Sequence, residues 1–198
     1  GGGGVASARL RTPGVVAVVL VAVACATWAT QWVRRSRTGG REPGATQLLD
    51  RFPEATKRTS MSHLQDAFHR EDVSLDERWA CLMALPSSRV TWRQAITAPA
   101  RLRVAYGLRP DTWHGPGDGA AFRVGIGARG AYRDVLTVWL NPAERETDRG
   151  LRTFDFDLSP YVGDDIDIVF NTAPGPSGNA VGDAALWCAP RLVPEPPR

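Results

Sequence analysis

The sequence predicts an all-β domain, an antiparallel β-sandwich, behind an N-terminal transmembrane helix. Beyond position 72, short strand-like runs bounded by glycine, proline and asparagine recur about every ten residues, a spacing typical of sandwiches. Within residues 154–158 and 165–170, large apolar side chains alternate with aspartate or valine, the period of a strand with one buried face. The run 14–33 is uncharged over 20 residues, long enough for a helix to cross the roughly 30 Å hydrocarbon layer of a bilayer.

The residues around this apolar run favour a retained single-pass anchor after a short tail, 1–13. Trp28 and Trp32 lie near its end and are followed by arginines, as expected where a helix leaves the membrane. A cleaved secretory signal is the alternative, because Ala24-Cys25-Ala26 has the small residues of a cleavage site, and a lipoprotein signal would place a lipid on Cys25. Since the run continues past this site to the tryptophans, we interpret it as an anchor.

The distribution of arginine bears on both topology and partners. Residues 1–41 hold six arginines and no acid, so the rest of the chain carries 18 basic and 21 acidic residues, a net charge of −3. A phosphate-binding face, and with it a nucleic-acid partner, is therefore not expected. Four of these arginines follow the membrane run and two precede it, which by the positive-inside rule favours a cytoplasmic domain. A role at the cell envelope instead predicts an extracytoplasmic domain. The two arguments disagree, so the topology stays open.

A linker with a short helix, 34–71, is predicted between the membrane and the sandwich. Leu48, Leu49 and Phe52 form a small apolar face within a helix at 45–55, and further helical turns are expected within 59–71. The sandwich then occupies 72–193, before a short tail at 194–198. Its strands are predicted at 73–85, 89–96, 102–108, 121–126, 135–140, 153–158, 166–170 and 185–192.

The three cysteines, Cys25, Cys81 and Cys188, are too few for a disulfide framework. Cys81 and Cys188 both lie in apolar contexts, so two separately buried thiols are the favoured interpretation. A disulfide between them is the alternative, and it requires that the domain lie in an oxidising compartment.

No pattern in the sequence predicts an enzyme. The segment 125–130 matches GxGxxG, but the short valine-rich and aromatic run after it predicts a hairpin loop with glycines at positive φ, not a dinucleotide site. His63, His69 and His114 share no metal-binding pattern, and Ser177 lacks the spacing of a nucleophile elbow. We therefore expect a non-catalytic domain without a cofactor.

Three segments of the predicted sandwich carry a resemblance to a known family. They are GDGAAFRVGI (117–126), DLSPYVG (157–163) and GDAALWCAPRLV (182–193). Together they resemble galactose-binding-like sandwiches, especially the carbohydrate-binding modules related to the NPCBM group. The resemblance implies a jelly-roll fold that binds a carbohydrate or cell-envelope glycan, and with the predicted anchor it indicates a membrane-anchored, non-catalytic binding module.

The resemblance also sets limits and leaves an alternative. In those modules a histidine commonly lies beside the closing acid, whereas Ala184 follows Asp183 here, which argues against direct transfer of that ligand contact. Similar domains occur on bacterial membrane proteins, and many members of the fold are structural. The alternative is thus a structural or protein-interaction domain, accessory to a membrane glycan-processing system and bound to a membrane-protein partner.

Carbohydrate binding requires flat aromatic rings to cover the C–H faces of a sugar, beside polar groups that bond its hydroxyls. A loop tryptophan with polar neighbours meets this requirement. The predicted ligand-binding residues are Trp113, His114, Arg109, Asp111 and Asn179. Tyr132 and Trp139, which flank the glycine-rich hairpin, are further candidate rings, and Trp92 and Trp187 are expected in the core.

The acidic residues give two hypotheses for a structural Ca²⁺. Four aspartates of the predicted strands face away from the core: Asp155, Asp157, Asp165 and Asp167. If these strands were neighbours, Ca²⁺ would relieve the repulsion, although a solvated outer face is the favoured interpretation. Asp118 and Asp183 each lie beside glycine at the start of a strand, which favours capping of a turn, with metal binding as the alternative.

Overall fold

The computed structural model describes residue 1 and residues 42–195, and nearly all regular structure within them is β-strand. The strands are β1 (Thr46–Gln47), β2 (Thr56–Thr59), β3 (Phe68–Ser74), β4 (Arg78–Ala84), β5 (Ser88–Ala95), β6 (Ala100–Leu108), β7 (Ala120–Ala128), β8 (Ala131–Leu140), β9 (Arg152–Asp157), β10 (Asp165–Pro174) and β11 (Ala185–Pro194). The helical elements are α2 (Leu64–Ala67) and the 3-10 turns η1 (Phe52–Glu54), η2 (Pro110–Thr112), η3 (Glu146–Asp148) and η4 (Ser159–Tyr161).

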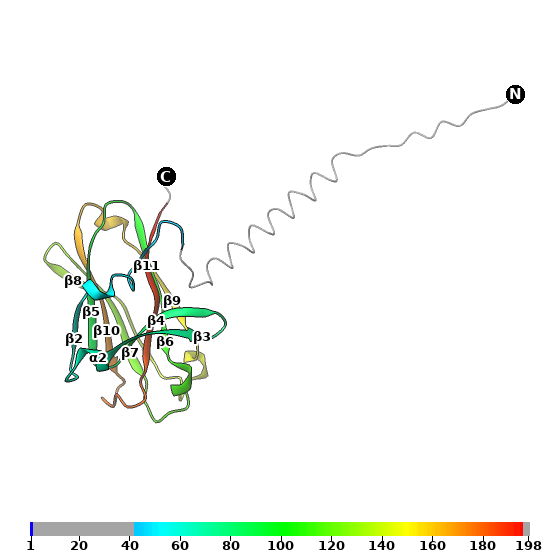
Figure 1. The fold of residues 1–198 in the computed structure, drawn as a ribbon, viewed down its shortest axis with the longest axis vertical. Helices are drawn as coiled ribbons and strands as arrows, with labels where there is room; N and C mark the ends of the chain where they lie inside the picture. The colour runs from blue at the N-terminus through cyan, green and yellow to red at the C-terminus, as the bar shows by residue number, and fades with distance from the viewer. Residues whose placement is uncertain (2–41, 196–198) are drawn as a thin grey trace. The chain divides into compact units, whose positions relative to one another are not determined.

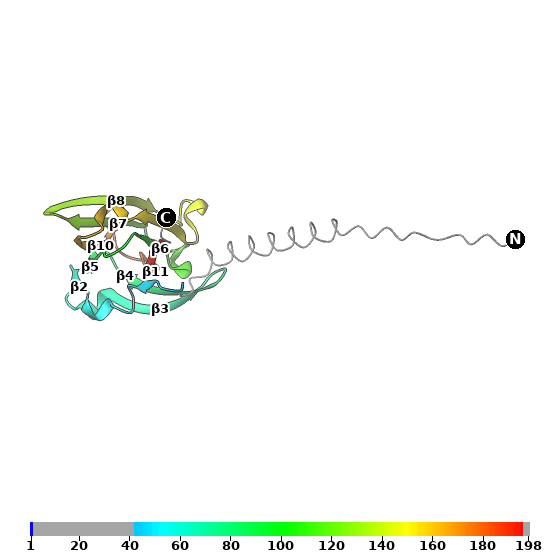
Figure 2. The ribbon, with the colours of Figure 1, turned by 90° about the horizontal axis from the view of Figure 1, so that it is seen from above.

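The strands form two antiparallel sheets that pack face to face. The six-stranded sheet has the order β3-β4-β11-β6-β9, with β1 paired to β11, and the five-stranded sheet has the order β2-β5-β10-β7-β8. Figures 1 and 2 show the two sheets as separate layers of the domain, with the last strand, β11, inside the first of them. The prediction of an antiparallel β-sandwich is confirmed.

The core between the sheets consists of the inward side chains that the alternating pattern predicts. On β10, Ile166, Ile168 and Phe170 are buried, while Asp165 is exposed and Asp167 is partly so. The ring of Phe170 packs against Trp92 and Trp187, with centroids 5.2 and 4.6 Å apart. The indole N–H of Trp187 donates to the Thr172 hydroxyl at 3.0 Å, so this buried polar group is satisfied.

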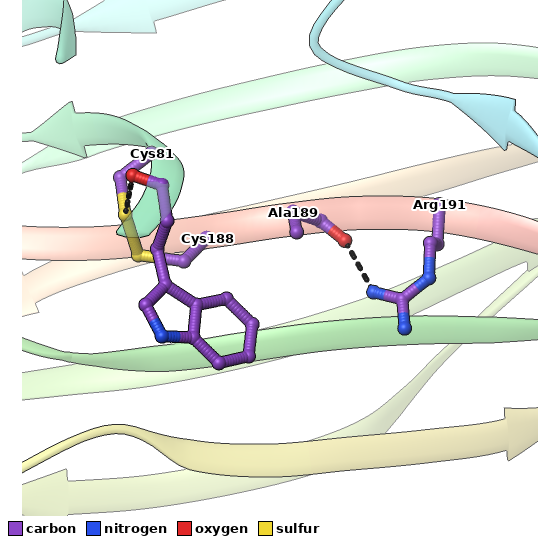
Figure 3. The surroundings of a disulfide bond; sticks show 5 residues. Cys81, Cys188, Ala189 and Arg191 are labelled. Carbon is purple, nitrogen blue, oxygen red and sulfur yellow. Dashed lines mark hydrogen bonds between the residues drawn. A yellow bond between two sulfur atoms is a disulfide. The ribbon is translucent and has the colours of Figure 1, made fainter. Parts of the chain in front are cut away.

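A disulfide joins Cys81 on β4 to Cys188 on β11, so the favoured interpretation of two separate thiols is wrong (Figure 3). The two residues lie 107 apart in the sequence but are direct partners in the register of neighbouring antiparallel strands. The bond lies in a small apolar cluster on the outer side of the six-stranded sheet, with Val73, Ala105 and Leu186. Strand pairing brings the sulfurs together, and the apolar contexts seen in the sequence reflect this outer cluster.

The segment before position 72 differs from the predicted linker and helix. Residues 46–59 form β1, the turn η1 and β2, and each of these strands joins a different sheet. Leu48 and Leu49 are buried in the core, so their apolar face belongs to the sandwich and not to a separate helix. The predicted turns within 59–71 reduce to α2, after which β3 begins.

The predicted anchor, 14–33, lies outside the described residues. Within the described part of the chain, no helix has the length and apolar character needed to cross a bilayer.

Candidate functional site

The loop that the sequence singled out for ligand binding is held mainly by contacts within the protein. Arg109 donates from Nε to the Asp111 carboxylate at 2.7 Å, and this hydrogen bond raises the pKa of its guanidinium. Trp113 packs its ring partly against the core and donates its indole N–H to the Leu108 carbonyl at 2.9 Å. His114 is exposed beside it. Because the ring and polar edge of Trp113 already have internal partners, the loop has a clear structural role, and its role in ligand binding stays a prediction.

Asn179 lies in the other loop at this end of the sandwich, between β10 and β11. Its side-chain oxygen accepts the Val181 N–H at 3.0 Å, and its own N–H donates to Ser177. Both are local bonds that shape the loop. Ligand binding by Asn179 therefore also stays a prediction.

Asp118 and Asp183 fasten these two loops together. Asp118 accepts the Ser177 N–H at 2.7 Å, and Asp183 accepts the Gly119 N–H at 3.2 Å, so each acid caps the backbone of the opposite loop. The approach is close, because a Cβ at Gly117 would lie 2.5 Å from the Asp183 carboxylate. The capping predicted from sequence is therefore present. Each acid, however, bonds to a residue of the other loop, 59 or 64 positions away in the sequence, and not to a residue of its own turn.

The two acids differ in their environment. The hydrogen bonds from Ser177 lower the pKa of Asp118, whereas burial raises the pKa of Asp183, which is 1% exposed, to about 6. One oxygen of each carboxylate accepts no hydrogen bond. No group of three or more His, Cys, Asp and Glu suited to a metal ion occurs among residues 42–195. Two carboxylates are few for Ca²⁺, which takes 6–8 oxygen ligands, so backbone or water oxygens would have to complete such a site.

The hypothesis that four strand aspartates crowd one surface is wrong. Asp155 lies on β9 in the six-stranded sheet, whereas Asp165 and Asp167 lie on β10 in the other sheet. Asp155 is paired with Arg101 and Arg103, and Asp165 lies 3.6 Å from Arg93. The acids are thus distributed over both outer faces, as the solvated-face interpretation expects.

The outer face of the five-stranded sheet contains two adjoining cavities. One has a volume of about 420 Å³ and the other about 750 Å³, and Arg58, Arg89 and Tyr132 line both. In Figure 2, β2 and the β7–β8 hairpin lie at opposite edges of this sheet. The first cavity is lined by Arg58, Thr59, Ser87, Ser88, Arg89, Arg123, Tyr132, Asp134, Asn171, Thr172 and Ala173. We call this cavity the sheet-face site.

Tyr132 lies across the sheet in this site and is 52% exposed. A Cβ at Gly125 would overlap the hydroxyl end of its ring, so the ring occupies the space that a side chain at Gly125 would fill. Its hydroxyl donates to Asp134 at 2.8 Å, and partial burial together with this acid raises its pKa. The absence of a side chain at Gly125 and the hydrogen bond to Asp134 therefore hold the hydroxyl end of an exposed aromatic ring against the sheet.

This arrangement corrects the interpretation of the GxGxxG segment. The predicted hairpin is present as β7–β8, but Gly125 and Gly127 are strand residues, and the positive φ angles belong to Arg129 (53°) and Gly130 (75°) in its two-residue turn. Gly125 serves to admit the Tyr132 ring. The sequence named Tyr132 as a candidate ring, but strand pairing was needed to show that a glycine lies beneath it.

Polar groups surround the ring. Arg89 donates from Nε to the Asn171 amide oxygen at 2.5 Å, which orients both side chains across β5 and β10. Asp134 and the hydroxyl groups of Thr59 and Ser87 line the same cavity. The sheet-face site thus combines one exposed ring with hydrogen-bond donors and acceptors, as recognition of a polyhydroxylated molecule requires.

Comparison with known proteins places the fold. No protein-family model matches the sequence. A stretch of 98 residues is 36% identical to an uncharacterised protein of Archaeoglobus fulgidus; it covers 49% of this chain and 25% of that protein, so the match spans a quarter of its length.

Among solved structures, CBM51 from Clostridium perfringens GH95, in complex with methyl-galactose, superposes with a TM-score of 0.50 over 75% of this chain and 99% of that one, at 9% identity. The tandem CBM51 modules of the Streptococcus pneumoniae family 98 glycoside hydrolase give a TM-score of 0.49 over 78% of this chain and 48% of theirs, at 12% identity. The chain therefore shares its β-sandwich fold with the CBM51 module from GH95.

Proposed function

We propose that this protein is a non-catalytic carbohydrate-binding module that holds a glycan of the cell envelope through its sheet-face site. The carrying observation is the exposed Tyr132 ring, which lines a polar cavity with its hydroxyl end over Gly125. The shared fold with a CBM51 module bound to methyl-galactose supports the class of function. The ring would cover the C–H face of one sugar, and the amide, hydroxyl and guanidinium groups around it would bond the sugar hydroxyls.

The affinity of such a site comes from a small contact. One aromatic face and a few hydrogen bonds offset the loss of translational and rotational freedom, so weak binding to a single sugar is expected. A polymer that contacts several sugar subsites, or several copies of the module at one surface, binds more tightly. The two adjoining cavities extend the site along the sheet, which favours a chain over a free monosaccharide.

Binding to a glycan array and isothermal titration with the polysaccharides it identifies will test this function. The full chain in detergent should bind at least one envelope polysaccharide, and Tyr132→Ala should abolish that binding. Tyr132→Phe keeps the ring and should retain most of it. If the wild type binds no polysaccharide, or if Tyr132→Ala binds as the wild type does, the proposal is wrong and the protein-interaction alternative takes its place.

We further propose that residues 14–33 anchor the protein in the membrane, with the sandwich on the extracytoplasmic side. The Cys81–Cys188 disulfide supports this side, because disulfides persist in oxidising compartments. The arginine count around the apolar run argues for the opposite side. A topology reporter fused after Arg198 decides between them, and an external signal together with thiols that resist alkylation before reduction is the expected result.

A further inference from the structure

Three arginines lie in one row across the outer face of the five-stranded sheet. The strand register pairs Arg58 on β2 with Arg89 on β5, then Arg89 with Asn171 on β10, and Asn171 with Arg123 on β7. Neighbouring strands lie about 4.8 Å apart, so Arg123 lies roughly 10 Å beyond Arg89 along the row. All three arginines are exposed, and all three line the sheet-face site.

The row carries positive charge that the fold does not neutralise. Within the described part of the chain, no carboxylate lies within ion-pair distance of any of these three arginines, and Arg89 is bonded to a neutral amide. Arg58 and Arg89 are direct cross-strand partners, a placement that is destabilising for like charges. A row of unpaired cations across a sheet is therefore unfavourable for the domain alone.

The only acid among the residues that line the cavity, Asp134, accepts the Tyr132 hydroxyl. Three arginines against one aspartate give the lining a charge of +2, although residues 42–198 together carry a net charge of −3. The positive potential is thus local to this cavity and is not a property of the whole domain. Guanidinium groups bind carboxylate, sulfate and phosphate oxygens in bidentate geometry.

We propose that the glycan bound by the sheet-face site is anionic: a polymer whose sugars carry carboxylate, sulfate or phosphate groups. This inference rests on the proposed carbohydrate-binding function. The Tyr132 ring takes a sugar face, while the arginine row takes the acidic substituents on the sugars beside it. Arg123 lies across Asn171 from Arg89, so the row offers cationic groups on both sides of the amide that bonds neutral hydroxyls.

Titration of the full chain in detergent with matched polymers will test this inference. De-esterified polygalacturonate and its fully methyl-esterified form have the same backbone but differ in charge; dextran sulfate and dextran repeat the comparison for sulfate. Wild-type protein should bind an anionic form at least about 10-fold more tightly than its neutral partner, and this preference should fall as salt rises. The pair that shows the larger preference identifies the acidic group.

Variants that remove single charges will show whether the preference for anionic polymers depends on the arginine row. Arg123→Gln and Arg58→Gln should each weaken binding of the anionic polymer by roughly 10- to 100-fold and weaken binding of the neutral polymer much less, because glutamine still offers a hydrogen-bond donor to a hydroxyl but carries no charge. Arg78→Gln is the matched control, because Arg78 lies on the other sheet and is paired with Asp72. Circular dichroism of each variant should show the wild-type fold.

The outcomes separate this inference from the function on which it rests. Equal binding of charged and neutral forms, lost in Tyr132→Ala, would refute the anionic ligand but keep the carbohydrate-binding function. Equal binding of duplex DNA or of anionic phospholipid vesicles would show a general anion site and overturn the inference. No binding of any polysaccharide would overturn both.

Discussion

The outer faces of the two sheets differ in whether their arginines form ion pairs. On the six-stranded sheet, Arg101 and Arg103 share the Asp155 carboxylate, and each also reaches a glutamate, Glu195 or Glu42. The five-stranded sheet instead leaves its arginine row unpaired around an exposed ring. Arg101 and Arg103 thus have acidic partners, whereas the three arginines of the row have none among the described residues, although Arg93 on the same sheet pairs with Asp165. The neighbouring side chains decide the difference.

The remainder of the outer six-stranded face is also occupied. The Cys81–Cys188 disulfide lies there in an apolar cluster, which Trp79, Met83 and Leu151 partly cover. By contrast, glycine and threonine on the five-stranded sheet leave space above the strands, where the cavities lie. This difference supports the proposed location of the glycan on the five-stranded sheet.

Removal of the disulfide is expected to have the largest effect on this comparison. Cys81→Ala with Cys188→Ala opens a loop of 107 residues and should lower the free energy of unfolding by about 4 kcal/mol, mainly because the unfolded chain gains entropy. Urea denaturation of wild type and variant checks this value. Folded variant protein should still bind glycan, because the cluster lies on the opposite sheet; lost binding in folded protein would show that the faces are not independent.

Asp118 and Asp183 in the end loops, which accept backbone N–H groups instead of pairing with arginine, provide a third environment. Because the pKa of Asp183 is raised from 3.8 to about 6 in the folded state, the folded protein binds the proton more tightly than the unfolded chain. The resulting stability is present below about pH 4 and is lost as pH rises through 6, by about 3 kcal/mol at 1.36 kcal/mol per pKa unit.

Urea denaturation from pH 4 to 7 in chelator measures this effect, with Asp183→Asn as the comparison. The wild type should lose stability relative to the variant across this range. Repetition with Ca²⁺ tests the structural metal hypothesis at Asp118 and Asp183. A rise in wild-type stability that both Asp118→Asn and Asp183→Asn remove would support a bound ion, whereas the same stability with and without Ca²⁺ would contradict it.

A methyl group added beneath the Tyr132 ring should show whether this ring is the surface that contacts the sugar. Gly125→Ala places a Cβ where the Tyr132 ring lies and should displace it, weakening glycan binding about 10-fold, or 1.4 kcal/mol. Gly127→Ala is the matched control on the same strand and face, because its Cβ would lie at an ordinary 3.4 Å from Asp167. Equal glycan binding by both variants would count against Tyr132 as the ring that contacts the sugar.

The smallest expected effect is the change in domain stability when an arginine from either sheet is replaced. Arg103→Gln breaks the partly exposed pairs with Asp155 and Glu42 and should lower the free energy of unfolding by up to about 1 kcal/mol. Arg58→Gln removes a like charge opposite Arg89 and should leave stability unchanged or raise it by a few tenths of a kcal/mol. Thermal denaturation of both variants at low salt tests the difference, and a greater loss in Arg58→Gln would contradict our account of the row.

Much of the architecture could be predicted because strand periodicity is a local property. The alternation of Ile166, Ile168 and Phe170 with outward residues defines a buried face without knowledge of any partner strand. Capping by Asp118 was predicted from adjacent glycine. The prediction of a helix at 45–55 failed because spacing alone cannot distinguish a short helix from a two-residue strand followed by a turn.

The candidate site was less predictable, because it depends on which strands are neighbours. Trp113 was selected as a loop aromatic, yet the structure engages its indole with Leu108, whereas Tyr132 lies exposed above a glycine of the preceding strand. The arginines of the row come from three strands spread between positions 58 and 123. The sequence around each arginine does not indicate whether an acidic side chain lies next to it on a neighbouring strand.

By itself, the sequence determined that this chain contains a two-layer antiparallel sandwich with a glycine-containing hairpin, because alternation and turn chemistry act over a few residues. Only the tertiary structure decided that Cys81 meets Cys188, that Asp155 and Asp165 lie on different faces, and that one sheet keeps an open surface. The physical reason is that strand order and register join residues far apart in the chain, and these pairings decide which charges are neutralised and which remain available.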